Sequence, residues 1–568
     1  MKLLSTLQAL GALAVGTGAV PTPDSDVEIE SIPVTVNAPA GSIIGESVLK
    51  VESFNGIPFA KPPVGPLRLK PPVRFEGILE SFDATDTAPA CPQMIVSNEA
   101  PDLPSKAVDA LLSLPFFEKI TGQEDCLTIT VQRPAGVKEG DNLPVLFWIF
   151  GGGFEIGATS TYNGGDMLRF ANRQDQPFIF VAVNYRVAGF GFMPGAEILA
   201  DGSSNIGLLD QRMGLEWVAD NIAAFGGDPD KVTIWGESAG AISVFDQMAL
   251  YGGDASYKGK PLFRGGIMNS GSAVPADPVD CPKGQAIYDQ VVDHAGCASS
   301  ADTLACLREV DYDTFFDAVN SVPGIFSYNS VALSYLPRPD GVVLRASPDD
   351  IVASGEYHAV PMIVGDQEDE GTFFSLFQGN LSTTADFANY LHDLFFHGAT
   401  VEELTELLET YDTNPSEGSP FRTGRRNQLY SGFKRLSAIL GDLVFTLTRR
   451  VFLDTAVVAH PDVPAWSYLS SYDYGTPVLG TFHGSDIVQV FYGFFPNHAA
   501  RSCRTYYLNF LYNLDPNVGV GDYAEWPEWK EDRRLMWFET AKKNSFLPDD
   551  FREDSYQWIL ENTKKLHI

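Results

Sequence analysis

Continuous apolar runs recur along most of the chain, each bounded by glycine, proline or polar residues. The run from Pro144 to Phe150 is the longest and ends at three consecutive glycines, Gly151–Gly153. Runs of this length without polar alternation are typical of central strands that are covered on both faces. The same pattern predicts further strands over residues 178–184, 232–235, 265–269, 361–364 and 465–468.

Apolar residues at helical spacing lie between two of these runs. Leu215, Val218, Ile222 and Phe225 predict an amphipathic helix over residues 211–225. Strands that alternate with helices indicate an α/β fold with a mostly parallel sheet and helices on both faces. No Pro- or Ser-rich linker divides the series, so we expect one large domain over residues 20–568, although the length alone suggests several domains.

The first 19 residues have the pattern of a secretory signal peptide. Lys2 is followed by an apolar stretch from Leu3 to Val15, and small residues precede Ala19. No later run reaches about 18 apolar residues, so we predict no transmembrane segment. The sequence thus predicts a secreted, extracellular protein. Asn380 begins an Asn-Leu-Ser sequon and is a candidate for glycosylation.

Composition excludes several classes of function. With 39 Lys and Arg against 73 Asp and Glu, the formal net charge is −34, which argues against nucleic-acid binding and against docking on an anionic membrane. A hydrophobic content of 44% argues against disorder. An even number of cysteines favours disulfides in an oxidising compartment, while the spacing leaves the pairing open. The six are Cys91, Cys126, Cys281, Cys297, Cys306 and Cys503.

A candidate nucleophile follows the strand predicted at 232–235. Gly236-Glu237-Ser238-Ala239-Gly240 fits Gly-x-Ser-x-Gly between a strand and a helix. In that context the tight turn presents the serine oxygen, and the helix N-terminus favours negative charge beside it. The sequence therefore predicts Ser238 as the nucleophile of an acyl transfer.

A serine nucleophile needs a base and an acid, which on this fold follow it along the chain in the order acid, then histidine. His483 lies in a glycine-flanked loop after the strand predicted at 465–468, whereas we expect His392, His397, His460 and His498 to be solvated or structural. The acid should end a strand, and four carboxylates follow the run at 361–364. Residue chemistry does not choose among them, and three are expected to be solvated surface charges; they are Asp366, Glu368, Asp369 and Glu370.

Acyl transfer also needs donors for the oxyanion of the tetrahedral intermediate. The glycines at 151–153 follow a predicted strand, and backbone without side chains can approach a ligand closely there. The N–H of Ala239, directly after the nucleophile, would supply another donor. No metal site and no cofactor are expected.

These motifs resemble the type-B carboxylesterase/lipase family of the α/β-hydrolase fold. The resemblance spans roughly residues 30–560 and is closest to Candida rugosa-like fungal lipases and sterol esterases. Thr130 and Gln132 depart from the family's second signature. The segments that carry the resemblance are residues 225–240, 124–128, 184–187 and 205–211, with 365–374 and 479–483 for the fungal lipases.

The resemblance assigns roles that the residues alone leave open. It implies Glu370 as the triad acid and His483 as the base, and oxyanion donors at Gly152, Gly153 and Ala239. It further implies that Phe373 and Phe374 line the acyl pocket, that Cys91 pairs with Cys126 and Cys297 with Cys306, and that residues 92–125 form a mobile lid at a lipid–water interface. A third bridge between the remaining Cys281 and Cys503 is our hypothesis.

The sequence therefore predicts a secreted serine hydrolase of lipid esters, a triacylglycerol lipase or sterol esterase that works through an acyl-enzyme. One alternative is a carboxylesterase for small soluble esters without interfacial activation. A remote alternative is a non-catalytic adhesion-type member, which the presence of Ser238, Glu370 and His483 disfavours. The base must start neutral, so activity should fall below its pKa, about 6.5 when unperturbed. The oligomeric state stays open.

Overall fold

The computed structural model describes residues 31–95, 120 and 122–568. The predicted signal peptide (1–19) and most of the predicted lid (92–125) lie outside the described residues.

One large mixed sheet organises the chain. Its strands run in the order β1-β2-β3-β5-β7-β6-β8-β11-β12-β13-β14-β15, with β4 paired to β2, and β9 and β10 form a separate pair. The strands are β1 (Ile32–Ala38), β2 (Gly41–Val48), β3 (Val51–Pro58), β4 (Leu79–Asp83), β5 (Thr128–Pro134), β6 (Leu143–Ile149), β7 (Ile179–Val183), β8 (Gly227–Glu237), β9 (Ser256–Tyr257), β10 (Lys260–Pro261), β11 (Gly265–Asn269), β12 (Met362–Gln367), β13 (Ala465–Ser470), β14 (Arg534–Thr540) and β15 (Lys543–Pro548).

The centre of the sheet is parallel and its edges are antiparallel. All pairings from β7 through β6, β8, β11, β12 and β13 to β14 are parallel. The pairs β1–β2, β2–β3, β3–β5, β5–β7 and β14–β15 are antiparallel. Because parallel strands all end at one edge, the segments that follow β6, β8 and β12 emerge together.

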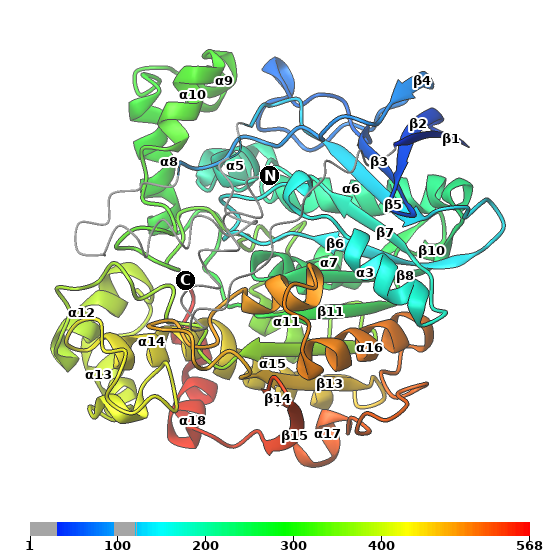
Figure 1. The fold of residues 1–568 in the computed structure, drawn as a ribbon. Helices are drawn as coiled ribbons and strands as arrows, with labels where there is room; N and C mark the ends of the chain where they lie inside the picture. Colours follow the sequence, from blue (N-terminus) through cyan, green and yellow to red (C-terminus); the bar gives the residue numbers. More distant parts are fainter. Residues whose placement is uncertain (1–30, 96–119, 121) are drawn as a thin grey trace, which may run out of the picture.

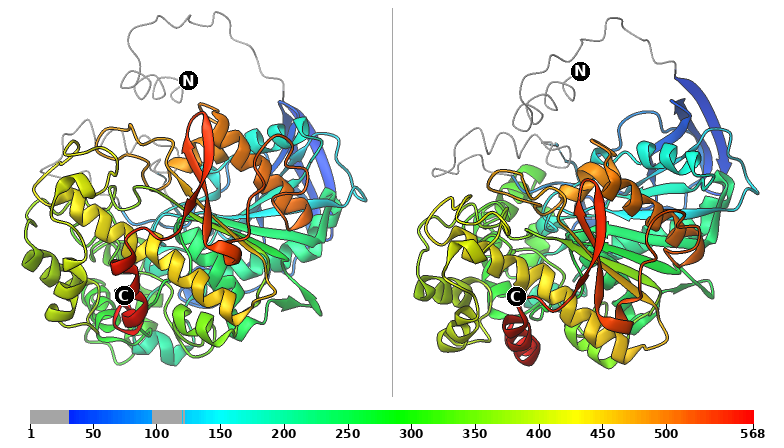
Figure 2. Two further views of the ribbon diagram at one scale, coloured as in Figure 1. Left: turned by 90° about the horizontal axis from the view of Figure 1, so that it is seen from below. Right: turned by 60° about the horizontal axis from the view of Figure 1, so that its bottom comes forward.

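Helices cover both faces of this sheet (Figures 1 and 2). α6, α7, α11 and α15 pack in series on one face, and α3 and α16 lie on the other, where both contact η7 (Ile487–Phe491). The α-helices are α3 (Gly165–Arg173), α4 (Ala188–Gly191), α5 (Ala196–Asp201), α6 (Ile206–Asn221), α7 (Ala239–Gly253), α8 (Pro282–His294), α9 (Thr303–Glu309), α10 (Tyr312–Val319), α11 (Pro348–Ser354), α12 (Thr384–Leu394), α13 (Val401–Glu409), α14 (Phe433–Gly441), α15 (Leu447–Ala459), α16 (His498–Asn513), α17 (Trp529–Asp532) and α18 (Glu553–Asn562).

Shorter helical segments complete the fold. Two of them are π-helices, η6 (Asp442–Thr446), which joins α14 to α15, and η7 (Ile487–Phe491). The 3-10 segments are η1 (Gly65–Leu67), η3 (Thr159–Thr161), η4 (Ile222–Phe225), η5 (Pro415–Glu417) and η8 (Thr563–Lys565).

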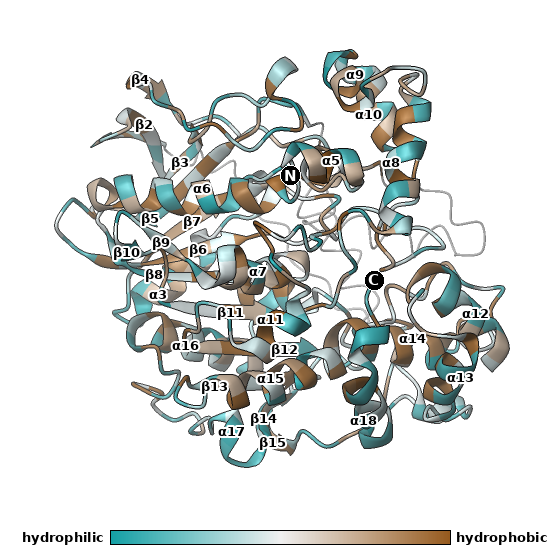
Figure 3. Ribbon diagram, turned by 180° about the vertical axis from the view of Figure 1, so that it is seen from behind, coloured by the Kyte–Doolittle hydropathy of each residue, from teal (hydrophilic) through white to brown (hydrophobic). Residues whose placement is uncertain are grey.

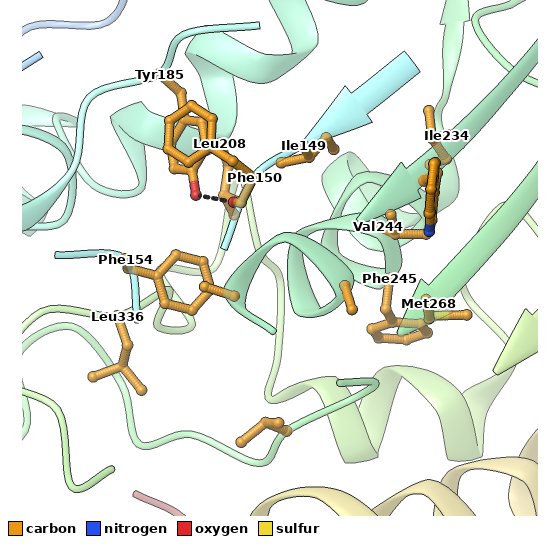
Figure 4. Close-up of a cluster of buried hydrophobic side chains, with 14 of the residues drawn as sticks. Ile149, Phe150, Phe154, Tyr185, Leu208, Ile234, Val244, Phe245, Met268 and Leu336 are labelled. Carbon is orange, nitrogen blue, oxygen red and sulfur yellow. Dashed lines mark hydrogen bonds between the residues drawn. The ribbon is translucent and has the colours of Figure 1, made fainter. Parts of the chain in front are cut away.

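The core fills the space between the central strands and their helices. Residues of β6 and β7 from Val145 to Ile149 and from Ile179 to Val183 are almost wholly buried, as their uninterrupted apolar runs predict. Figure 4 shows this core, in which the Tyr185 hydroxyl donates to the Phe150 carbonyl at 2.7 Å. The outer helices α6, α8 and α18 instead alternate hydrophilic and hydrophobic residues (Figure 3).

The structure confirms the predicted fold class and each predicted strand. The helix predicted over 211–225 begins earlier, at Ile206, because Asn205 turns the chain in the left-handed region (φ 53°) just before it. Its last turn tightens into η4. Long segments follow the carboxyl ends of β11 and β12 and carry α8–α11 and α12–α15. Figure 1 shows α8–α10 and α12–α14 beside the sheet.

The cysteines confirm two of the three expected bridges. Cys91 is bonded to Cys126, and Cys297 to Cys306. The hypothesis of a third bridge is wrong, because Cys281 and Cys503 are both free and buried. Cys281 caps the N-terminus of α8, where its sulfur accepts from the N–H of Gly284, and Cys503 lies within α16. Figure 1 shows these two helices far apart.

Two further expectations concern the surface. Asn380 is exposed in a turn, so its side chain is accessible; its glycosylation stays a prediction. Within the described part of the chain, no helix has the length and apolar character that crossing a bilayer requires.

Candidate active site

Ser238 occupies the sharp turn between β8 and α7. Its backbone has φ 57° and ψ −127°, a strained conformation for a residue with a side chain. The Ser238 N–H donates to the carbonyl of Asn269 at 2.9 Å, and the Ser238 carbonyl accepts from Ile242 at 3.0 Å. The neighbouring strand and the first helical turn therefore hold the serine in place at the carboxyl edge of the sheet.

The two glycines of the motif allow this turn. A Cβ at Gly236 would come within 2.2 Å of the backbone of Gly240. A Cβ at Gly240 would come within 2.0 Å of the Ile149 carbonyl oxygen. Helix α7 can approach β8 and β6 this closely only because neither position has a side chain.

Glu370 and His483 meet beside this turn. His483 Nδ1 lies 2.6 Å from Glu370 Oε2, and the other carboxylate oxygen of Glu370 accepts from the N–H of Gln367 at 2.6 Å. Glu370 is 1% exposed and follows β12, while His483 lies in the loop between β13 and η7. Of the four carboxylates that sequence reasoning left open, Glu370 is the one bonded to the imidazole.

The other three carboxylates of this segment are not solvated surface charges, contrary to expectation. Asp366 is buried against Arg449 (2.8 Å), and Glu368, only partly exposed, pairs with Arg422. Asp369 is fully buried and accepts hydrogen bonds from Ser419 Oγ and from the N–H groups of Phe421 and Thr481, at 2.8, 2.8 and 2.9 Å. These partners lie far along the chain, so the acidic cluster alone does not reveal its burial.

Asp369 also ties the end of β12 to the loop that carries His483. Its N–H donates to the carbonyl of Thr481 at 3.0 Å, while its carboxylate receives the Thr481 N–H. A Cβ at Gly480 would come within 2.1 Å of this carboxylate. Asp369 thus fixes the loop two residues before His483, a positioning role that sequence reasoning missed.

The glycine segment after β6, residues 151–153, faces the same cavity as Ser238 and His483. Gly152 and Gly153 have φ of 113° and 63°, a left-handed backbone that favours glycine. Among the described residues, none accepts a hydrogen bond from the N–H of Gly152, Gly153 or Ala239. These three predicted donors are therefore available to a ligand.

One cavity brings these groups together. Ser238, His483, Phe373, Phe374 and the glycines 151–153 all line it. Phe374 packs its ring 4.9 Å from the His483 ring, and Phe445 of η6 packs at 4.6 Å. No hydrogen bond joins Ser238 Oγ to His483 here; such bonds are often long until substrate binds.

Glu237 is a site residue that sequence reasoning missed. Its Oε1 lies 3.4 Å from His483 Nε2, and its side chain is 7% exposed. Burial raises the pKa of Glu237 to about 8, although the nearby His483 opposes this. An ionisable residue directly before the predicted nucleophile, at a strand end, is the signal that could have revealed it.

The surroundings of His483 shift its pKa in the direction opposite to burial. Burial alone lowers the pKa, but the carboxylates of Glu370 and Glu237 outweigh it and raise the pKa of His483 to about 9. His483 is therefore not an unperturbed imidazole, and the fall of activity at low pH is expected to begin above pH 6.5.

A second cavity, mostly apolar, adjoins the first and shares Gly153, Ser238, Ile325 and Phe374 with it. Phe154 and Leu336, shown in Figure 4, belong to its wall. Val444 and Phe445 of the π-helix η6 also line it. Short π-helical segments within α-helices often accompany functional sites. Nothing in the sequence pattern indicates the one at η6.

The described ends of the predicted lid attach beside the glycine segment. Gln93 donates to the Gly157 carbonyl at 2.6 Å and accepts from its N–H at 2.7 Å. The N–H of Met94 donates to the carbonyl of Glu155 at 2.9 Å. Across the described residues, no cluster of three or more His, Cys, Asp or Glu side chains could hold a metal ion.

Comparisons with known proteins agree with this arrangement. The carboxylesterase family model matches residues 33–558. The chain is 64% identical over 543 residues to a secreted triacylglycerol lipase of Gibberella zeae, covering 95% of this chain and 92% of that protein. It is 58% identical to secreted lipase 1 of Botryotinia fuckeliana, covering 100% and 98%.

More distant relatives include lipase 4 of Diutina rugosa, at 45% identity over 89% of this chain and 90% of that protein. The crystal structure of EstA from Aspergillus niger superposes with a TM-score of 0.77 at 26% identity, covering 94% of this chain and 99% of that one. Because the family model matches nearly the whole chain, the chain belongs to the carboxylesterase family and is a serine carboxylic-ester hydrolase.

Proposed function

We propose that this protein is a secreted lipase or sterol esterase that hydrolyses lipid esters with Ser238 as nucleophile, His483 as base and Glu370 as acid. The observation that carries the proposal is one cavity lined by Ser238, His483 and the glycine segment, with His483 hydrogen-bonded to Glu370. The relatives named as secreted lipases support both the lipid substrate and secretion.

Acylation begins when His483 Nε2 takes the proton of Ser238 as its Oγ attacks the ester carbonyl carbon. Glu370 accepts the Nδ1 hydrogen bond, which orients the ring and stabilises its charged form. His483 then gives the proton to the departing alcohol. Water, deprotonated by His483, then attacks the carbonyl carbon of the acyl-enzyme, and His483 returns the proton to Ser238 Oγ as the fatty acid leaves.

The oxyanion of each tetrahedral intermediate would be held by three backbone groups. The N–H groups of Gly152, Gly153 and Ala239 are free of other described acceptors. The positive end of α7 adds to their field at the same point. Donors fixed before reaction stabilise the developing charge without reorganisation, and losing one typically costs about 2.7–4 kcal/mol.

The adjoining apolar cavity would take the acyl chain. It begins at Ser238, and its walls are mainly Ile, Leu, Val and Phe side chains with Phe374 at the junction. Burying a long hydrocarbon there is favourable in proportion to the apolar area removed from water. This favours esters of long fatty acids over small soluble esters.

The substrate class is tested by comparing three esters with the purified enzyme: an emulsified long-chain triacylglycerol, a long-chain steryl ester and a short-chain soluble ester. We expect turnover of the two lipids to rise steeply once they exceed their solubility limits. A preference for the soluble ester, with smooth saturation through the solubility limit of the lipids, would instead identify a carboxylesterase of small esters.

A further inference from the structure

Asp246 is a buried carboxyl group in the wall of the apolar cavity. Its exposure is 0%, and neither Oδ1 nor Oδ2 has a hydrogen-bond partner among the described residues. Apart from Ser238, it has the only polar side chain among the described residues that line this cavity. A polar group left buried without a partner costs folding free energy, so its position here needs a reason.

Other buried carboxylates of the protein show what a structural role looks like. Asp210 receives three hydrogen bonds from Arg186, two from its guanidinium and one from its backbone N–H. Asp549 is paired with both Arg449 and Arg450. Asp246 has no such partner, so it does not serve the fold in the same way.

The position of Asp246 follows from the geometry of α7. Ser238, Ile242 and Asp246 all line the cavity and are spaced four residues apart, so one face of the helix forms this wall. Eight residues at 1.5 Å each place Asp246 about 12 Å along the axis from the nucleophile. The cavity therefore has the reacting serine at one end and the carboxyl group two turns away.

An acyl chain attached to Ser238 and following this face would pass the carboxyl group at a definite place. An extended chain advances roughly 1.2 Å per bond, so 12 Å corresponds to about ten bonds. Burial raises the pKa of Asp246 to about 8, so at neutral pH the group is protonated and can both donate and accept a hydrogen bond.

We propose that Asp246 determines specificity in the acyl cavity, and that the enzyme prefers esters whose long acyl chain carries a hydroxyl or carbonyl oxygen near its tenth carbon. The desolvation of Asp246 is already complete in the folded protein. A chain oxygen that reaches it gains a hydrogen bond, whereas one beside the apolar side chains of the cavity is buried without a partner. This inference rests on the proposed function, because it takes Ser238 as the nucleophile.

A positional series tests this with the wild-type enzyme. The substrates are ethyl octadecanoate and its 6-, 10- and 16-hydroxy derivatives, presented at equal mole fraction in the same detergent micelles. We expect kcat/KM for the 10-hydroxy ester to exceed that for the 6- and 16-hydroxy esters by about three- to tenfold, the range of one neutral hydrogen bond. A flat profile across the three positions would overturn the proposal.

Variants assign the effect to the side chain. Asp246→Leu should abolish the maximum at carbon 10 and favour the unsubstituted ester, while Asp246→Asn should keep the maximum because its amide still donates and accepts. Ser243→Ala is the matched control: Ser243 is buried on the same helix but accepts from Gln211 Nε2 at 3.0 Å, away from the cavity. Its profile should equal that of wild type.

The failures of the two proposals are distinguishable. A maximum at carbon 10 that survives in Asp246→Leu contradicts the role of Asp246 and leaves the proposed lipid-ester hydrolysis intact. Hydrolysis of all four esters that persists in Ser238→Ala contradicts the proposed mechanism itself. The wild-type profile needs no variant, so the proposal can be tested even where Asp246→Leu does not fold.

Discussion

His483 is flanked by two carboxyl groups, one at each ring nitrogen. Glu370 holds Nδ1 at 2.6 Å, and Glu237 lies 3.4 Å from Nε2, the nitrogen that receives the serine proton in the proposed mechanism. A negative charge at Glu237 therefore stabilises the charged imidazole and opposes its action as a base. The charge on Glu237 should therefore raise the pH at which His483 becomes the neutral base.

The first prediction concerns pH. Because the pKa of His483 is raised to about 9, kcat/KM should increase as the pH rises from 6 toward 9. Glu237→Gln removes one of the charges that raise this pKa, so the acid limb should move to lower pH by about one unit. Measuring kcat/KM from pH 5 to 10 for both proteins tests this, and superimposable acid limbs would contradict it.

Glu237 and Asp246 also show where residue-level prediction stops. The Gly-x-Ser-x-Gly pattern and its place after an apolar strand predict Ser238, because both signals are local. The neighbours of Glu237 and Asp246 are brought together by other elements, such as the His483 loop and the strand-end glycines. Spacing along one segment contains no information about those contacts.

At the scale of elements, the end of β12 and the His483 loop act as one unit. Asp369 joins them through Thr481 and also binds Ser419 and the backbone of Phe421. This unit places the proposed acid and base, Glu370 and His483, which lie on different segments, within hydrogen-bond distance.

The second prediction tests that unit. Asp369→Ala should lower kcat by about 10- to 100-fold with little change in KM, because a shift of about 1 Å in a catalytic group can cost that much. Glu368→Gln alters the adjacent residue, whose partner is Arg422, and should cost less than about threefold. Equal losses in both variants would show that Asp369 has no special positioning role.

The third prediction concerns the helix α15 and the sheet. Arg449 bonds Asp366 at the end of β12, Asp549 after β15, and Ser467 of β13. Arg449→Met leaves the buried Asp366 carboxylate without its cation and Asp549 with Arg450 alone, and should lower the free energy of unfolding by about 3–5 kcal/mol. The exposed pair Arg534–Asp532 provides the control, and Arg534→Met should cost at most about 1 kcal/mol in urea unfolding.

Element-level prediction succeeded where the pattern is continuous and failed where it depends on distant partners. The strands β6, β7, β8, β11, β12 and β13 were all predicted, because doubly covered strands need unbroken apolar runs. The acidic segment after β12 was misinterpreted as mostly solvated, because Arg422, Arg449 and Ser419, which lie 50 or more residues away, bury it. The role of Glu370 was implied only by family resemblance.

At the scale of the whole molecule, the cysteines test the arrangement of the helices. Cys281 begins α8 and Cys503 lies in α16, far apart in the fold. The fourth prediction is that the unreduced protein shows two reactive thiols per chain in denaturant and six after reduction. Finding none before reduction would require a third bridge and a different packing of these helices.

The overall charge of −34 belongs to this scale as well. It favours solubility and disfavours binding to anionic surfaces, without specifying the reaction. The proposed chemistry depends on a few buried groups at the carboxyl edge of the sheet, and the last measurement is directed at them.

The most direct test of the account is the rate of fatty-acid release from an emulsified long-chain triacylglycerol by wild type and by Ser238→Ala, with urea unfolding to verify that both are folded. The proposed mechanism predicts that the variant loses at least about 10³-fold in kcat, because the acyl-enzyme cannot form without the serine oxygen. A folded Ser238→Ala protein that hydrolyses the ester at the wild-type rate would contradict it.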